Sequence, residues 1–283
     1  MRFPFLRLAF PLLAATPIFA AERPVIATEP ATLWYSEQFT FHSKSVGRDF
    51  LIQVARPADP MPGKTPAVFL LDGNTLFPMA ASMLGLDGFD GTFEPAFVIA
   101  VGYKAATKAE WATQRTVDLR FAPAGAPPGD SRKGAAFARF LTTELRPLIE
   151  ARYHTDPHRA VLAGHSFGGS FVTHMLLNQP GAFDEYLLGS PALFSEPDLL
   201  AKASTFVAPV KTRVFLSIGE KEQASDKDPN RWVGNVRTLA AALTDHASNV
   251  DLKLEVVPGE GHVSSIPILL EDGFRFLLPP VPK

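Results

Sequence analysis

The chain has 283 residues, 46% of them hydrophobic, and a mean hydropathy of +0.08, which is enough apolar material for one large folded core. Its formal net charge is −2 and no basic stripe with interleaved aromatics is present, so the sequence does not indicate nucleic-acid binding. The absence of cysteine excludes disulfides and cysteine-based zinc sites, and the seven histidines show no His-Glu-x-x-His spacing, so we expect neither a metal nor an organic cofactor.

The first 20 residues have the composition of a secretory signal peptide. Arg2 and Arg7 are basic, an apolar run follows over 8–15, and the bond between Ala20 and Ala21 is the expected cleavage point. The apolar run is shorter than the roughly 20 residues that span a bilayer, so we expect no stable membrane span. The sequence therefore predicts export, to the periplasm or the medium, with the rest of the chain (21–283) forming a single domain.

Strand-like and helix-like segments alternate along that domain. Two segments, 39–41 and 49–55, are joined by a turn around Gly47 and predict an antiparallel pair. Apolar runs at 67–71 and 97–101 are typical of strands that helices cover on both faces. Further strands are predicted at 160–163, 186–188, 213–218 and 251–257, and helices over 135–152, 170–177, 230–246 and 264–277. The order predicts an α/β fold with a mostly parallel central sheet, antiparallel N-terminal strands and helices on both faces.

The pattern Gly-x-Ser-x-Gly at 164–168 lies between a predicted strand and a predicted helix. A serine in this setting is typical of the nucleophile elbow of α/β-hydrolases. Gly164 and Gly168 leave room for the sharp turn, and free N–H groups of the following helix favour a developing negative charge beside Ser166. We predict that Ser166 is a nucleophile; the alternative is a glycine-rich turn that only packs against its sheet.

Such a hydrolase needs an acid and then a histidine later in the chain, each after a strand. His262 follows the strand at 251–257 between two glycines, and we predict that it is the general base. Glu222, after the strand at 213–218, is the first choice for the acid, with Glu220 as the alternative. A solvated acidic loop, and a Ser–His dyad without a close carboxylate, remain open.

An oxyanion hole requires backbone N–H groups aimed at the reacting oxygen. We predict that Phe167, directly after the nucleophile, and Asn74, in the loop after the strand at 67–71, supply them. The alternative for residues 72–74 is an ordinary β-turn, because Asp-Gly-Asn is a common turn sequence.

The segment 103–134 is rich in proline, glycine and charge, and we expect it to cover or line the site. Arg115 and Arg120 within it are candidates to bind an anionic group of a substrate. The alternative is that Arg115 forms an internal ion pair with Asp118 that orders the segment.

Several short motifs occur in one order along the chain, at 70–74, 101–103, 115–119, 140–149, 164–169, 190–193 and 219–222. In that order they resemble the esterase-D-like branch of the α/β-hydrolases, and the resemblance covers roughly 36–278. Within the branch the chain is most similar to periplasmic siderophore esterases, which cut the ester bonds of catecholate trilactones such as enterobactin. The resemblance implies Ser166 as nucleophile and His262 as base, and an acid that is weak or absent in some members.

Two stretches depart from the family pattern. The residues 118–123 replace an expected Asp-Tyr/Leu-Thr-Pro and include Arg120, and Phe194 stands near a position where tryptophan is expected. We predict an exported serine ester hydrolase that acts through an acyl-enzyme on a small-molecule ester, with a catecholate siderophore or its iron complex as the favoured substrate. The alternatives are a general carboxylesterase, an acyltransferase, to which a more distant likeness to mycolyltransferases points, and a non-catalytic binding protein of the same fold.

Overall fold

The computed structural model describes residues 32–86, 91–223, 228 and 231–280, and the residues from Leu33 onward form one compact unit. The predicted signal peptide and its cleavage bond lie outside the described residues. No helix in the described part of the chain is both long enough and apolar enough to cross a membrane.

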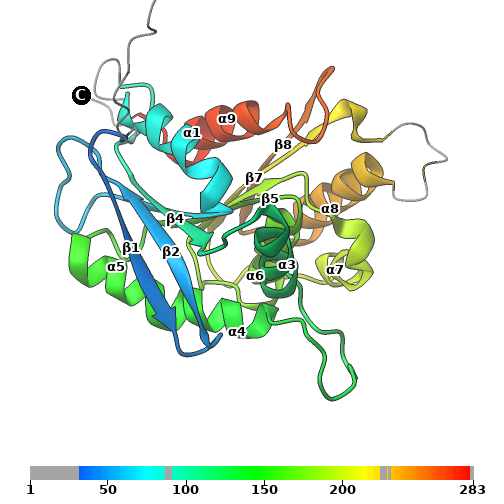
Figure 1. The fold of residues 1–283 in the computed structure, drawn as a ribbon. Coiled ribbons are helices and arrows are strands. Elements are labelled where there is room, and N and C mark those ends of the chain that lie inside the picture. The colour runs from blue at the N-terminus through cyan, green and yellow to red at the C-terminus, as the bar shows by residue number, and fades with distance from the viewer. Residues whose placement is uncertain (1–31, 87–90, 224–227, 229–230, 281–283) are drawn as a thin grey trace, which may run out of the picture. The chain divides into compact units, whose positions relative to one another are not determined.

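The described strands form one sheet in the order β1-β2-β4-β3-β5-β6-β7-β8 (Figure 1). Their bounds are β1 (Ser36–Ser43), β2 (Arg48–Ala55), β3 (Ala67–Leu71), β4 (Phe97–Tyr103), β5 (Ala160–His165), β6 (Glu185–Gly189), β7 (Thr212–Gly219) and β8 (Val250–Val257). The pairs β1–β2 and β2–β4 are antiparallel, and every later neighbouring pair is parallel. The predicted sheet, mostly parallel with an antiparallel start, is therefore confirmed, and it is that of the α/β-hydrolase fold.

The helices are α1 (Gly73–Gly85), α3 (Lys108–Asp118), α4 (Gly134–Arg139), a π-helical stretch (Phe140–Leu145), α5 (Arg146–Tyr153), α6 (Phe167–Asn178), α7 (Pro197–Ala203), α8 (Trp232–His246) and α9 (Ile266–Leu277). The single helix predicted over 135–152 consists of α4, the π-helical stretch and α5 in succession. The sequence patterns did not indicate α1, which holds Pro78 in its interior, nor α3 and α7. Pro78 lies in the second turn, where a missing N–H weakens the helical signal.

Two hydrophobic cores cover the two faces of the sheet. Side chains alternate along each strand, so Phe69 and Leu71 of β3 enter one core while Val68 and Leu70 enter the other. One core packs against α4, α5, α6 and α8, and the other against α1 and α9 (Figure 1). Each fully buried leucine, valine or phenylalanine side chain stabilises the folded state by roughly 1.5–3 kcal/mol, so both cores hold the sheet rigid.

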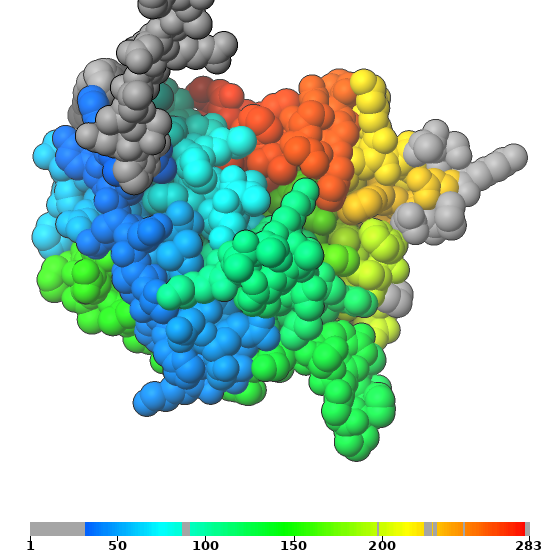
Figure 2. Space-filling model, viewed as in Figure 1, coloured from blue at the N-terminus to red at the C-terminus, as the bar shows by residue number. Residues whose placement is uncertain are grey.

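The parallel strands β3, β5, β7 and β8 bring their carboxyl ends to one edge of the sheet. The loops after these strands carry Asn74, Ser166, Glu222 and His262, so the topology gathers the predicted site residues there. The segment between β4 and α4 crosses this side: α3 lies in front of α6, and the loop after α3 extends away from the sheet (Figure 1). In the space-filling view the same segment lies on the face toward the viewer (Figure 2).

Candidate active site

Ser166 occupies a strained turn between β5 and α6. Its φ of 62° and ψ of −122° are rarely adopted by a residue with a side chain, and a conformation of this kind costs roughly 1–3 kcal/mol. The surrounding structure holds it there, because the Ser166 N–H donates to Gly189 O at 2.9 Å and the Ser170 N–H donates to Ser166 O at 3.0 Å. The serine is thereby fixed at the N-terminus of α6.

The glycines around Ser166 are required by close backbone contacts. A Cβ on Gly164 would lie 2.6 Å from the carbonyl carbon and oxygen of Gly168, and one on Gly169 would lie 2.5 Å from Gly189 O. Both distances are below any real Cβ contact, and the atoms in the way are backbone, so an alanine would have to move the turn. This crossing of β5 and α6 is the local reason for the Gly-x-Ser-x-Gly-Gly sequence.

His262 and Glu222 are in direct contact. The Nδ1 atom of His262 lies 2.6 Å from Glu222 Oε2. The other oxygen, Oε1, accepts hydrogen bonds from Ser190 Oγ at 2.7 Å and from Gly219 N at 2.8 Å. Only 1% of the Glu222 side chain is exposed, against 32% for His262. The carboxylate is thus saturated by three donors and can orient the imidazole.

Glu220 plays a different part, because it ties together the two loops that carry Glu222 and His262. Its Oε2 accepts the Gly259 N–H at 2.9 Å, and the Lys221 N–H donates to Glu260 O at 2.9 Å. A Cβ on Gly219 would lie 2.6 Å from Glu260 O, so the loops touch at this glycine. The structure therefore brings Glu222, and not Glu220, to His262.

The charge of Glu222 is favoured by its partners. Burial alone would raise the pKa of this carboxyl, but the hydrogen bonds from His262, Ser190 and Gly219 outweigh burial and lower the pKa below its ordinary value. Glu222 is therefore ionised at neutral pH, the state that can stabilise a protonated imidazole.

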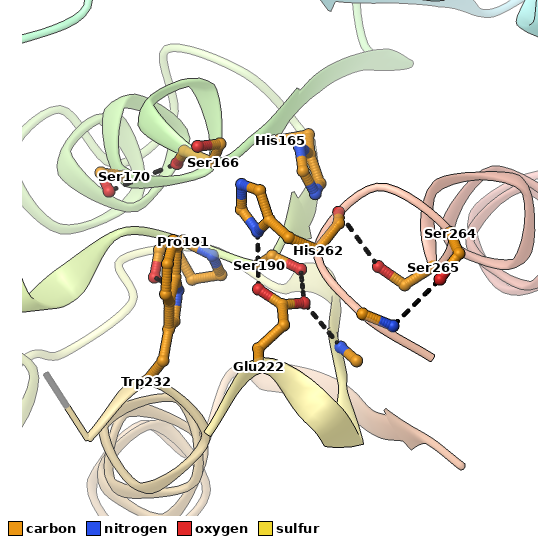
Figure 3. Close-up of polar contacts among 12 residues, drawn as sticks. His165, Ser166, Ser170, Ser190, Pro191, Glu222, Trp232, His262, Ser264 and Ser265 are labelled. Atoms are coloured by element: carbon orange, nitrogen blue, oxygen red, sulfur yellow. Dashed lines mark hydrogen bonds and ion pairs between the residues drawn. The ribbon is translucent and has the colours of Figure 1, made fainter. Parts of the chain in front are cut away.

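Ser166 and His262 lie on the same side of the sheet edge. In Figure 3 the second ring nitrogen of His262, the one not bonded to Glu222, points toward Ser166. Among the described residues, no hydrogen bond joins the Ser166 hydroxyl to this nitrogen. Bonds of this kind are often long or poorly aligned before substrate binds. The arrangement has the chain order and the parts of a serine–histidine–acid triad.

Two aromatic rings hold His262 in place, and the sequence did not point to either. The ring of His165 lies 4.4 Å from that of His262, and the ring of Trp232 lies 4.6 Å from it (Figure 3). Burial, and then the nearby His262, lowers the pKa of His165 to about 3, so this neighbour adds no positive charge beside the base. His165 and His262 are 97 residues apart, so no local sequence pattern could predict the contact between their rings.

Ser190 is a third residue that the sequence did not single out as functional. It has a left-handed backbone, with φ of 40°, and follows β6 directly. Its N–H donates to Ser217 O at 2.8 Å while its hydroxyl donates to Glu222. The strained turn thus aims the hydroxyl at the buried carboxylate.

The amides of Phe167 and Asn74 both belong to the first turn of a helix, where N–H groups have no intrahelical acceptor. The Asn74 side chain fixes its loop to β4: its Oδ1 accepts from Tyr103 N at 2.6 Å, and its Nδ2 donates to Tyr103 O at 2.9 Å. Gly102 is needed beside it, because a Cβ there would lie 2.8 Å from Asn74 Oδ1. The alternative of an ordinary β-turn at 72–74 is wrong, because Gly73 begins α1. The amides of Asn74 and Phe167 thus lie in first turns of helices, where no intrahelical acceptor is available to them.

Arg115 does not pair with Asp118, so that alternative is wrong. Its guanidinium donates to both oxygens of Asp72, at 2.6 and 2.7 Å, and to His165 O at 3.1 Å. Asp118 is instead buried against β2, 3.4 Å from Arg48 Nη1. The Arg115 side chain is only 12% exposed, and its Nε and Nη2 donors are already bonded to Asp72 and His165 O, which does not suit it to bind an anionic substrate group.

Arg120 is more open. Its Nε lies 3.7 Å from Glu196 Oε1, a distance too long for a hydrogen bond, and 30% of the side chain is exposed. Its guanidinium carbon lies 5.8 Å from the ring centroid of Phe167, the residue after Ser166. Of the two arginines, Arg120 is therefore the better candidate to bind an anionic group. Its guanidinium lies beside Phe167 and is not fully paired with a carboxylate.

Comparisons with known proteins show what this chain is similar to. The Esterase family model, described as "Putative esterase", matches residues 43–263. Ferri-bacillibactin esterase BesA of Bacillus subtilis is 30% identical over 256 residues, which cover 84% of this chain and 88% of that protein. The siderophore enterobactin esterase of Emericella nidulans is 28% identical over 247 residues, covering 75% and 81% of the two chains. The crystal structure of the BES protein from Bacillus cereus matches with a TM-score of 0.77 and 25% identity, over 90% of this chain and 99% of that one.

Proposed function

Because the chain belongs to the Esterase family and is a hydrolase that acts on esters, we propose that Ser166, His262 and Glu222 carry out the hydrolysis through an acyl-enzyme. The observation that carries the proposal is the 2.6 Å contact between His262 Nδ1 and the buried Glu222. That contact leaves the other imidazole nitrogen, which faces the elbow in Figure 3, free to take a proton from the serine.

In the first half of the reaction, Ser166 Oγ attacks the ester carbonyl carbon while its proton passes to His262 Nε2. The imidazolium is stabilised by the ionised Glu222 at Nδ1. The tetrahedral intermediate collapses, the bond to the alcohol oxygen breaks, and His262 returns the proton to that oxygen. Water then attacks the acyl-enzyme in the same way, with His262 again taking and returning the proton, and the carboxylic acid is released. No redox partner is needed.

The negative oxygen of the intermediate requires donors that are in place before the reaction. We assign this role to the backbone N–H groups of Phe167 and Asn74. Support comes from their positions in the first turns of α6 and α1, where N–H groups point away from the helix and the helix dipole favours negative charge.

As substrate we propose a catecholate siderophore, with its trilactone esters as the bonds that are cut. The relatives described above are esterases of ferri-bacillibactin and of enterobactin by name. A catecholate offers aromatic rings and negative charge. Phe194, with 41% of its surface exposed, packs edge-to-face on Trp232 at 5.1 Å, and the Trp232 ring in turn lies 4.6 Å from that of His262. Arg120 supplies a cation beside Phe167.

The test is hydrolysis by the purified protein of three substrates: a short-chain 4-nitrophenyl ester, an iron-free catecholate trilactone and its iron complex. We expect the trilactones to be cleaved with a kcat/KM at least tenfold above that of the short ester. Ser166→Ala should abolish cleavage of all three while the protein stays folded.

The other outcomes separate the competing functions. Cleavage of the short ester alone would make the protein a carboxylesterase with another natural substrate. A new ester formed with an added acceptor alcohol would identify an acyltransferase. Well-folded protein that binds a trilactone and cleaves nothing would be a binding protein, and full activity of Ser166→Ala would remove the acyl-enzyme.

We also propose that the protein works outside the cytoplasm after loss of residues 1–20. The support is the sequence alone: two arginines, a short apolar run and a small residue at position 20. Mass spectrometry of the protein from fractionated cells tests the idea. A mature N-terminus at Ala21 in the exported fraction is expected, and an intact Met1 in the cytosolic fraction would contradict it.

A further inference from the structure

One side chain joins the two loops that carry the proposed oxyanion donors. Arg115, on α3, holds Asp72 with two hydrogen bonds and His165 O with a third. Asp72 is the residue two before Asn74, and His165 is the residue two before Phe167. The guanidinium therefore bridges the start of α1 and the start of α6 within a few bonds of both amides.

The geometry of this bridge is specific to arginine. A guanidinium is planar and presents its donors in a fixed fork, so two parallel bonds to a carboxylate set orientation as well as distance. In this case Nη2 is shared between Asp72 Oδ2 and the carbonyl of His165, which places the carboxylate and the elbow around one nitrogen. The guanidinium carbon also lies 5.6 Å from the ring centroids of both Trp111 and Phe167, so it is held from its faces too.

The backbone on either side of this bridge is constrained. Asp72 has a left-handed conformation, with φ of 59° and ψ of 40°, which a residue with a side chain avoids unless its surroundings impose it. The opposite loop is equally tight, because a Cβ on Gly168 would lie 3.3 Å from Asp72 Oδ2. The carboxylate of Asp72 is thus packed between Arg115 and the first turn of α6.

We propose that Arg115 is a positioning residue that sets the spacing between the N–H groups of Asn74 and Phe167. It touches neither substrate nor reacting atoms, and it acts through Asp72 and the carbonyl of His165. The role rests on the proposed acyl-enzyme mechanism, because it matters only if the two amides hold an oxyanion. This role also explains why an arginine, rather than a neutral side chain, is buried against the residues on either side of Ser166.

The experiment compares Arg115→Lys with wild type, using 4-nitrophenyl butyrate as substrate. Lysine keeps the charge and loses the fork, so the spacing of the two amides should loosen. We expect kcat to fall by up to about 10²-fold, the lower end of the loss that follows removal of one oxyanion donor. The inhibition constant of phenylboronic acid, which forms a tetrahedral adduct with an active-site serine, should rise by a similar factor. The inhibition constant of 4-nitrophenyl butyl ether, which has no carbonyl, should stay within about twofold, since it measures ground-state binding alone.

Arg146→Lys is the matched control. Arg146 is also mostly buried, with 15% of its side chain exposed, and bonds Glu150 at 2.7 Å and the carbonyls of Ala182 and Pro157. These carbonyls precede the amino ends of β6 and β5, whereas the elbow follows the carboxyl end of β5. Both variants should lower the unfolding temperature, but only Arg115→Lys should change kcat. Asp72→Asn provides a second route if Arg115→Lys folds poorly, because it weakens the same bridge from the other side.

Three outcomes would overturn the proposal. Wild-type kcat in both Arg115→Lys and Asp72→Asn would make the bridge a stabilising contact only. Equal weakening of phenylboronic acid and of the ether would show that Arg115 acts on general substrate binding. A loss of kcat without any change in the boronic acid constant would place its effect outside the oxyanion hole. Failure of the acyl-enzyme itself would be seen separately, as full activity in Ser166→Ala.

Discussion

On the acid–base side of the site, Glu222 and His262 sit on loops that follow two neighbouring strands, β7 and β8, and the loops bond directly to each other. On the oxyanion side, the loops after β3 and β5 are joined by a side chain from α3, a helix outside the sheet. Strand order brings the loops together on both sides, because β3 and β5 are adjacent parallel strands just as β7 and β8 are. The difference lies in how the adjacent loops are joined. Bonds between the two loops themselves join them on the acid–base side, whereas one arginine from a helix outside the sheet joins them on the oxyanion side.

The largest effect that would test the acid–base side is expected from Glu222→Gln. Two donors, Ser190 Oγ and Gly219 N, meet at Oε1, so the single amide oxygen must occupy that position. The NH₂ group then faces His262 Nδ1 and donates to it, which places the imidazole proton on the nitrogen that should accept the serine proton. We expect kcat to fall by about 10³-fold or more, measured on the short chromogenic ester.

Glu220→Gln is the matched control for that prediction. The bond from Gly259 N to Glu220 Oε2 can be kept by an amide oxygen, so we expect only a small loss of activity and a modest loss of stability. If Glu220→Gln were the inactive variant and Glu222→Gln the active one, Glu220 would be the acid.

A smaller effect on the same side is expected from Ser190→Ala. The variant removes one of the three donors to Glu222, and a hydrogen bond to a charged group is worth about 1.5 kcal/mol, or roughly tenfold in rate. Its loss should also raise the pKa of Glu222, so the loss of activity that follows protonation of this carboxyl should begin at a higher pH. Ser217→Ala is the control, because that hydroxyl is buried without a partner. A lower rate with an unmoved pH profile would show that Ser190 supports only the local backbone.

The smallest effect on catalysis is expected from Asp118→Asn, which changes the anchoring of α3. Burial, opposed by Arg48 and Lys133, raises the pKa of Asp118 from 3.8 to about 6. Between these values the folded state binds more protons than the unfolded state, so the free energy of unfolding falls as pH rises from about 4 to about 6 and then levels off. The total change is on the order of 3 kcal/mol.

Urea unfolding at pH 4 and at pH 8 measures this contribution. Asp118→Asn lacks it and should gain stability relative to wild type at the higher pH. A difference between Asp118→Asn and wild type that did not change with pH would contradict the prediction.

The parts that sequence patterns predicted are those set by local chemistry. Every predicted strand is present, because an apolar run between turn residues needs no distant partner to be recognised. The elbow at Ser166 and the loop position of His262 are likewise encoded in a few consecutive residues. The sequence favoured Glu222 as the acid but left Glu220 open, because the two lie on one short turn and only the direction of each side chain separates them.

The parts that were missed depend on contacts between distant residues. Arg115 and Asp118 are three apart on one helix, a spacing that favours a local pair. The structure instead sends Arg115 to a carboxylate 43 residues earlier and Asp118 to β2. The start of α1 was read as a turn because Asp72 and Gly73 are common turn residues. Those choices are decided by tertiary packing, which no single segment of the sequence contains.

The loop that follows α3 closes on itself, since the Lys133 N–H donates to Val117 O at 2.7 Å and the Gly134 N–H donates to Arg120 O at 2.9 Å. Arg115 lies before this loop and pins α3 to the sheet edge, while Arg120, at the start of the loop, faces the neighbourhood of Phe167. In evolutionary terms, the segment between β4 and α4 has two parts. Changes in α3 affect the reaction chemistry through Arg115, and changes in the loop after α3 affect which substrates are accepted. Insertions and replacements after α3 can alter which esters are accepted while the reaction chemistry is inherited unchanged, and recombination of this loop between relatives would be a practical way to redesign selectivity.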